Sequence, residues 1–131
     1  MDLQLAGKSC LITGASRGIG WGTAKIMADE GCRVALVARR EQLLNELADE
    51  IAGAGHERPV VIAEDVTRQG APEQIRECAY AAFGGLDILV NSAGGSRPIP
   101  WDAPVDVWHE GMTLNFEMLR QLTHQFIPGM R

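Results

Sequence analysis

Strand-like and helix-like segments alternate four times along these 131 residues, which restricts the chain to a small set of folds. Short apolar runs typical of buried strands occupy residues 9–13, 33–38, 60–63 and 86–90. After each run, apolar residues recur at helical spacing. The predicted helices cover about residues 18–30, 43–51, 72–83 and 104–126, and we expect Pro128 and Gly129 to close the last one.

The order β-α-β-α-β-α-β-α predicts an α/β fold, in which helices cover both faces of a parallel sheet. Right-handed crossovers make this a doubly wound, Rossmann-like half with the strand order 3-2-1-4. No repeat or linker interrupts the chain, so we expect residues 1–131 to form one domain. Ligands bind beyond the carboxyl ends of the strands in such sheets, so the residues after each strand are the candidates for a site.

Net charge and cysteine content limit the classes of function that the chain can have. The formal net charge of −5 gives no support for nucleic-acid binding, and no apolar run approaches the roughly 20 residues of a membrane span. The start of the chain lacks the pattern of a signal peptide. Cys10, Cys32 and Cys78 are scattered, which favours reduced thiols over a disulfide framework. We therefore expect a cytoplasmic protein with neither a nucleic-acid nor a membrane partner.

A glycine-rich turn, Gly14, Gly18 and Gly20, follows the first strand. Glycines allow a tight turn and a close backbone approach, and the N-terminus of the next helix offers free N–H groups to a pyrophosphate. Ser16 can add a hydroxyl. The same stretch also reads G-x-S-x-G, the turn of a serine nucleophile, but the acid, histidine and oxyanion loop of that chemistry have no matching pattern. We interpret the turn as a nucleotide-binding site.

Two arginines follow the second strand. A fold that prefers NAD places a carboxylate there for the ribose hydroxyls, whereas this chain has Ala38, then Arg39 and Arg40. An arginine pairs with a 2′-phosphate, and Arg17 could reach the same group from the glycine turn. This pattern predicts NADP (NADPH) over NAD. The alternative is that Arg39 and Arg40 are solvated residues at the start of the next helix.

The other two strand ends carry weaker signals. Asp65 follows the third strand and can accept a hydrogen bond from an adenine amino group, or can form an ordinary Asx turn. After the fourth strand, Asn91 is followed by small residues at 92–95 that let the backbone lie against a cofactor. The alternative there is a simple strand-to-loop turn.

Taken together, TGASRGIG at 13–20, DV at 65–66 and NSAG at 91–94, with an asparagine in the last helix, resemble the short-chain dehydrogenase/reductase family in its T-G-x-x-x-G-x-G branch. The resemblance covers essentially the whole chain; Ser92 departs from it, because a second Asn is usual there. It implies hydride transfer between NADPH and a carbonyl or secondary alcohol, with a 3-oxoacyl thioester as one candidate, in a homo-oligomer (dimer or tetramer). It also implies the cofactor contacts: Gly14, Ser16, Arg17 and Ile19 on phosphates and ribose, Arg39 on the 2′-phosphate, Asp65 and Val66 on adenine, and Asn91, Ala93 and Gly94 beside the adenosine ribose.

Asn115 interrupts an apolar helical stripe. At 100° per residue it shares a narrow face with five apolar side chains, Trp108, Met112, Leu119, Leu122 and Phe126, so we expect it to be buried. The resemblance makes it the catalytic asparagine, which holds a water in a proton relay. The alternative is a buried amide satisfied by a neighbouring group.

The proton donor that the resemblance implies, a Tyr-x-x-x-Lys pair with a partner serine, is missing. The one tyrosine, Tyr80, is followed four residues later by Gly84, and the only lysines are Lys8 and Lys25. We expect the chain to be an N-terminal half that ends before a fifth strand, is inactive alone and pairs with its own C-terminal half. A non-catalytic dinucleotide-binding or regulatory domain is the alternative. We expect no metal site, because Thr113 replaces the second histidine of H-E-x-x-H.

Overall fold

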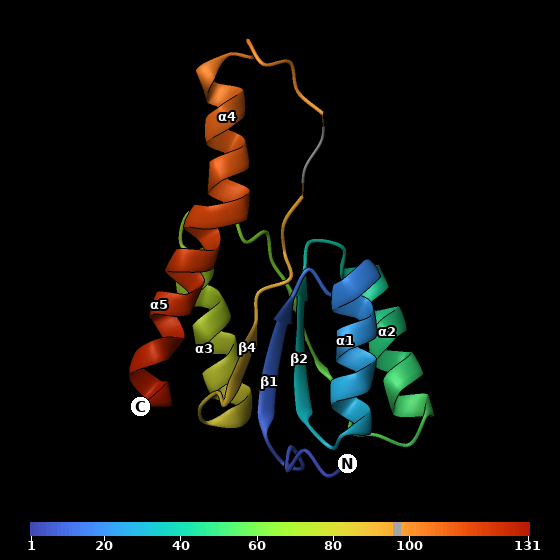
Figure 1. Ribbon diagram of the computed structural model, residues 1–131. Helices are drawn as coiled ribbons and strands as arrows, with labels where there is room; N and C mark the ends of the chain where they lie inside the picture. The colour runs from blue at the N-terminus through green and yellow to red at the C-terminus, as the bar shows by residue number, and fades with distance from the viewer. Residues whose placement is uncertain (96–97) are drawn as a thin grey trace.

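The computed structural model describes residues 1–95 and 98–131 and shows a four-stranded parallel sheet with helices on both faces (Figure 1). The strands have the order β3-β2-β1-β4, which confirms the predicted Rossmann-like topology. Along the chain the elements are β1 (Ser9–Thr13), α1 (Gly18–Asp29), β2 (Arg33–Ala38), α2 (Glu41–Gly53), β3 (Val60–Ala63), α3 (Ala71–Phe83), β4 (Ile88–Val90), α4 (Val105–Met112), the π-helix η1 (Thr113–Glu117) and α5 (Met118–Met130).

The strand register brings the four strand ends to one edge of the sheet. Thr13 at the end of β1 pairs with Val37, and Ala38 at the end of β2 pairs with Ala63. On the other side of β1, Ile12 pairs with Val90 of β4. The carboxyl ends of the four strands therefore lie at nearly the same level of the sheet, and the segments that follow them begin side by side.

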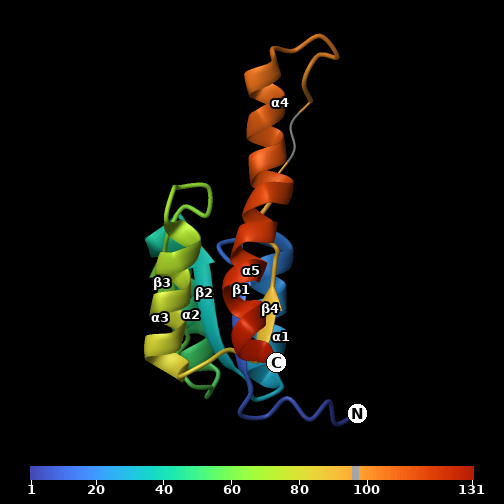
Figure 2. The same cartoon turned by 90° about the vertical axis from the view of Figure 1, so that its left-hand side faces the viewer.

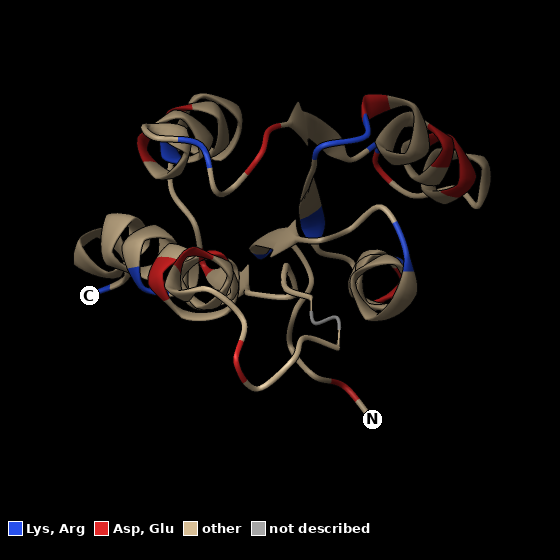
Figure 3. Ribbon diagram, turned by 90° about the horizontal axis from the view of Figure 1, so that it is seen from above, with Lys and Arg blue, Asp and Glu red and all other residues tan. Residues whose placement is uncertain are grey.

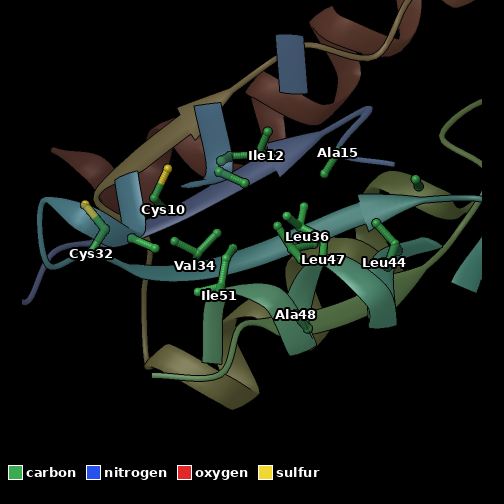
Figure 4. Close-up of a cluster of buried hydrophobic side chains, with 13 residues drawn as sticks. Cys10, Ile12, Ala15, Cys32, Val34, Leu36, Leu44, Leu47, Ala48 and Ile51 are labelled. Carbon is green, nitrogen blue, oxygen red and sulfur yellow. The ribbon is translucent and has the colours of Figure 1, made fainter. Parts of the chain in front are cut away.

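Alternation along the strands divides the core into two layers. Side chains such as Ile12 and Leu36 point to one face and pack against α1 and α2, as Figure 4 shows for Leu44 and Leu47 of α2. Their neighbours Leu11 and Val37 point to the opposite face, because successive strand residues alternate. That face is covered by α3 and α5 (Figure 2).

The last helix differs from the prediction at its C-terminal end. Pro128 and Gly129 do not close it, because α5 continues through both to Met130. Gly129 lies so close to the Tyr80 hydroxyl of α3 that a β-carbon there would clash with it. A residue without a side chain thus lets α5 approach α3, and Pro128 removes only one backbone hydrogen bond of the helix.

The predicted buried stripe is also wrong over its first half. Trp108, Met112 and Asn115 are exposed, and α4 has no buried residue. The helical segment from α4 to α5 is not regular α-helix throughout, because residues 113–117 form the wider π-helix η1. Above that point α4 extends past the end of the sheet (Figures 1 and 2), so no strand lies beneath its apolar side chains.

Residues 1–95 and 98–131 contain neither a candidate membrane span nor a candidate metal cluster. No helix there is both long and apolar enough to cross a membrane. In the same part of the chain, no group of three or more His, Cys, Asp or Glu side chains is arranged to hold a metal ion.

Candidate functional site

The strand ends surround a cleft of about 440 Å³. Figure 3 looks onto this edge of the sheet and shows basic residues on the loops that lead into α1 and α2. The lining includes every residue expected to bind the cofactor except Asn91, namely Gly14, Ser16, Arg17, Gly18, Ile19, Gly20, Arg39, Arg40, Asp65, Val66, Ala93 and Gly94. Leu114, from η1, also lines the cleft, and no sequence signal distinguished it from other apolar helix residues.

The glycines of the first turn have two different functions. A β-carbon on Gly14 would lie 2.7 Å from the Ser92 carbonyl oxygen, and one on Gly20 would clash with the Gly14 carbonyl. These two glycines therefore allow the backbone segments of the site to touch. Gly18, at φ +62°, has nothing within 4 Å of its β-carbon position, so this glycine leaves open space in the cleft. Together they form a cradle of backbone that fits a phosphate group.

The N-terminus of α1 faces this cradle without a side-chain cap. Arg17 is the N-cap residue in an extended conformation, and among the described residues no side chain accepts a capping hydrogen bond there. The first N–H groups of a helix have no partner within the helix. An anion beside Gly18 would receive them together with the partial positive charge of the helix dipole.

Asp65 holds the loop after β3 and keeps its charge near the arginines. Its Oδ1 accepts hydrogen bonds from the backbone N–H of Thr67 at 2.9 Å and from the Thr67 hydroxyl at 2.6 Å. These bonds, with the nearby charge of Arg39, lower the pKa of the Asp65 carboxyl below its usual range. The Asx turn considered above is thus present, and it does not displace Asp65 from the cleft lining.

Thr13 is a positioning residue that the sequence analysis did not single out. Its buried hydroxyl oxygen accepts hydrogen bonds from the backbone N–H groups of Ser92 at 3.1 Å and Ala93 at 3.0 Å. These bonds hold the small-residue segment against the glycine turn. A threonine at the end of an otherwise apolar buried strand was the available signal.

Asn91 lies on the other side of this segment. Its amide donates a hydrogen bond to the Thr123 hydroxyl of α5 at 3.0 Å. It lines a second hollow of about 410 Å³ with Asn115, Arg120 and His124 among others. The structure thus brings Asn91 close to Asn115, and its predicted contact with the adenosine ribose stays a prediction.

Asn115 clamps the loop after β4 to the helix. Its Oδ1 accepts from the Gly95 N–H at 3.0 Å, and its Nδ2 donates to the Gly95 carbonyl at 2.8 Å and the Gly111 carbonyl at 3.0 Å. The residue is exposed, so the expectation of a buried amide is wrong; it lies in η1, none of whose five residues is buried. The loop after β4 continues through residues 96 and 97, which lie outside the described residues.

Known proteins match this chain over nearly its whole length. The family model described as short chain dehydrogenase matches residues 8–131. A short chain dehydrogenase of Pseudocercospora fijiensis is 38% identical over 130 residues, which are 97% of this chain and 42% of that protein. The chain therefore spans less than half of this relative.

Solved structures give the same result. L-sorbose reductase from Gluconobacter frateurii, in complex with NADPH and L-sorbose, has a TM-score of 0.93 and 35% identity, covering 99% of this chain and 50% of that one. A 7α-hydroxysteroid dehydrogenase in complex with NADH and 7-oxo glycochenodeoxycholic acid has a TM-score of 0.94 and 32% identity, covering 98% and 50%. The glycine cradle, the strand order and these matches agree, and the chain belongs to the short-chain dehydrogenase family.

Proposed function

We propose that this chain is the NADP-binding part of an oxidoreductase that transfers hydride between NADPH and a carbonyl or secondary alcohol. Three arginines, Arg17, Arg39 and Arg40, line one cleft with the glycine cradle, and Ala38 occupies the position of an NAD-selecting carboxylate. This grouping of positive charge is the observation that carries the cofactor assignment. A 2′-phosphate is dianionic or nearly so, and a guanidinium binds it with two parallel hydrogen bonds.

The relatives alone do not decide between the two cofactors. One solved relative holds NADPH and the other NADH, so the preference rests on the arginines of this chain. The substrates in those two structures, L-sorbose and 7-oxo glycochenodeoxycholic acid, differ in skeleton, which leaves carbonyl compounds as the proposed class. A 3-oxoacyl thioester is one member of that class, and NADPH oxidation on adding one would test it.

Within this proposal each strand end has one task. The glycine turn and the α1 N-terminus receive the pyrophosphate, Arg39 receives the 2′-phosphate, and Asp65 with Val66 borders the adenine. When bound, NADPH supplies a hydride for the carbonyl carbon, and the oxygen then needs a proton. Asn115 is proposed to serve that proton path. Since its side chain is engaged with Gly95 and Gly111, its own contribution is to hold the loop and helix at fixed positions.

The described part of this chain offers no tyrosine or lysine near the cleft lining. Tyr80 lies between α3 and α5, in edge contact with Phe126 at 5.8 Å between ring centroids. Lys25 pairs with Glu50 at 2.7 Å, on the surface between α1 and α2. We propose that the general acid comes from a further part of the protein. A non-catalytic nucleotide-binding or regulatory domain is the second candidate, and these placements favour it for the chain on its own.

Titration with NADPH and NADH tests the cofactor assignment. We expect NADPH to bind at least about tenfold more tightly, and Arg39→Ala to remove most of that difference, as loss of a charge-assisted bidentate pair does. Arg58→Ala is the matched control, because Arg58 is an exposed arginine outside the cleft lining that pairs with Asp49. Tighter binding of NADH by the unaltered chain would overturn the NADP assignment.

Assay for carbonyl reduction separates the two candidate functions. We expect no turnover by the 131 residues alone and NADPH-dependent reduction when a C-terminal half is supplied. Binding of NADPH without reduction in both cases would favour the regulatory domain. A homo-oligomer (dimer or tetramer) located in the cytoplasm is also proposed for the intact protein, and light scattering after gel filtration measures its mass.

A further inference from the structure

Two carboxylates, Glu64 and Asp65, line the same cleft as the three arginines. Glu64 follows β3 and lines the cleft, and its side chain is only 14% exposed. Its backbone N–H bonds to the Ala38 carbonyl at 2.9 Å, which places Glu64 beside the residue that precedes Arg39. Arg39 and Glu64 each lie one position beyond the paired residues Ala38 and Ala63 of the sheet. Glu64 is thus next to the arginine proposed to receive the 2′-phosphate.

A free carboxylate at this position opposes a phosphorylated cofactor in two ways. It repels the phosphate directly, and in a partly buried cleft that repulsion is weakly screened. It also competes with the phosphate for Arg39, because an arginine pairs with either group through the same two N–H bonds. A cleft that selects NADP therefore needs a partner for Glu64.

Arg68 is that partner. Its Nε donates to Glu64 Oε1 at 2.7 Å and its Nη2 to Glu64 Oε2 at 3.0 Å, so both carboxylate oxygens are engaged by one guanidinium. Arg68 Nη1 also donates to the Gln69 carbonyl at 3.1 Å, which fixes the guanidinium plane. The hydrogen bonds and charge of Arg68 lower the pKa of the Glu64 carboxyl, so this group stays ionised and paired.

The loop holds Arg68 in place independently of this pair. The Arg68 backbone N–H bonds to the Asp65 carbonyl at 3.0 Å, and the Arg68 carbonyl receives the Ala71 N–H at 3.0 Å at the start of α3. Arg68 itself does not line the cleft. Its side chain reaches the cleft through its hydrogen bonds to Glu64, and its charge acts on Asp65 as well.

We propose that Arg68 is a positioning residue for cofactor choice. By engaging both oxygens of Glu64 it offsets the charge of this carboxylate and leaves Arg39 free for the 2′-phosphate, while the second carboxylate of the cleft, Asp65, is held by Thr67. This inference rests on the proposed NADP preference. It predicts that the selectivity of the cleft depends on a residue outside the cleft.

Arg68→Ala tests this with NADPH and NADH titrated separately by fluorescence. We expect NADPH to bind about five- to tenfold more weakly, as for one uncompensated charge near the site, while NADH affinity changes less than about twofold. The loss should shrink in high salt. Arg58→Ala is the matched control, because it removes the same charge from an arginine 49% exposed, against 54% for Arg68, and Arg58 is outside the cleft lining.

The double variant Glu64→Gln/Arg68→Ala separates charge from structure. We expect it to recover NADPH binding to within about twofold of the unaltered chain, since residue 64 then carries no charge that needs a partner. Equal loss of NADPH and NADH binding in Arg68→Ala, or no recovery in the double variant, would overturn the inference while leaving the NADP assignment intact. A preference for NADH in the unaltered chain would instead overturn both. Circular dichroism of each variant confirms that the fold is retained.

Discussion

The two ends of the last helical segment have similar apolar spacing and opposite burial. Phe126 in α5 is fully buried, whereas Phe116 in η1 is 57% exposed. Met118 and Leu122 are buried beside Phe126, while Trp108 and Met112 lie exposed towards the other end. The difference is what lies beneath each end, since α5 packs on α3 and the sheet and α4 extends beyond them (Figure 2).

This contrast shows that having an apolar face and having that face covered are separate properties of a helix. A spacing of three and four residues reports that a helix has an apolar face. It does not report whether another element of the same chain covers that face. In this molecule the sheet ends at the middle of the stripe, so one pattern gives a core contact at one end and a bare surface at the other.

Alanine substitutions at Phe126 and Phe116 should show the largest difference in stability between the two ends. We expect Phe126→Ala to lower the free energy of unfolding by about 3–5 kcal/mol, because it leaves a cavity between α5 and the sheet. Phe116→Ala should change that free energy by less than about 0.5 kcal/mol and improve solubility. Urea unfolding followed by circular dichroism measures both. Equal losses would show that the exposed end is packed in solution.

Two glycines of α1 provide the next contrast, between a packed and an open position. Gly20→Ala would place a methyl group against the Gly14 carbonyl, so we expect a loss of about 1–3 kcal/mol in the free energy of unfolding and weaker NADPH binding. A β-carbon at Gly22 would meet nothing within 4 Å, so we expect Gly22→Ala to raise the free energy of unfolding by about 0.5–1 kcal/mol through its higher helix propensity. Thermal unfolding of the pair measures this. An unchanged Gly20→Ala variant would contradict the close approach at the turn.

Asn115 joins the exposed end to the packed part, and its removal should loosen that junction. We expect Asn115→Ala to cost about 1 kcal/mol, and the Gly95 amide to exchange its hydrogen about tenfold faster, because that N–H loses its acceptor. Asn45→Ala in α2 is the control for the helix propensity that alanine adds. Hydrogen exchange measured by NMR gives the result. Unchanged exchange at Gly95 would show that Asn115 is not the clamp.

Most of the fold could be predicted from the sequence, because its local patterns are mutually consistent. Buried strands of four to six residues, helices with one apolar face and glycines at the turns all favour one topology, and the doubly wound arrangement of such units gives the strand order. Pro128 and Gly129 show the limit. Both residues favour the end of a helix locally, yet α5 continues through them, and the close approach of Gly129 to Tyr80 is a tertiary feature that no local pattern contains.

The site could be predicted where backbone geometry determines it. The glycine turn and the segments after β2 and β3 follow from strand ends meeting at one edge, and they line the cleft as expected. What could not be predicted are the contacts between side chains and distant backbone. The Thr13 bonds to Ser92 and Ala93, and the direction of Asn91 towards Thr123, depend on the register of β1 with β4 and the position of α5.

The smallest expected effect concerns an ion pair at the junction of η1 and α5. Hydrogen bonds from Arg120 and Gln121 lower the pKa of the Glu117 carboxyl to about 2. Because the pKa is lowered in the folded chain, the pair stabilises the fold above the ordinary value of 4.5 and loses its effect as the pH falls through about 2. Both side chains are exposed, so the change in the free energy of unfolding should be close to the detection limit.

The titration itself should nevertheless be measurable. We expect Arg120→Ala to return the pKa of Glu117 most of the way towards 4.5, and Gln121→Ala to return it less, because the Arg120 hydrogen bonds are the largest cause of the shift. NMR of the Glu117 side-chain carboxyl against pH measures both variants. A Glu117 that titrates at its ordinary value in the unaltered chain would show that its pair with Arg120 is open in solution.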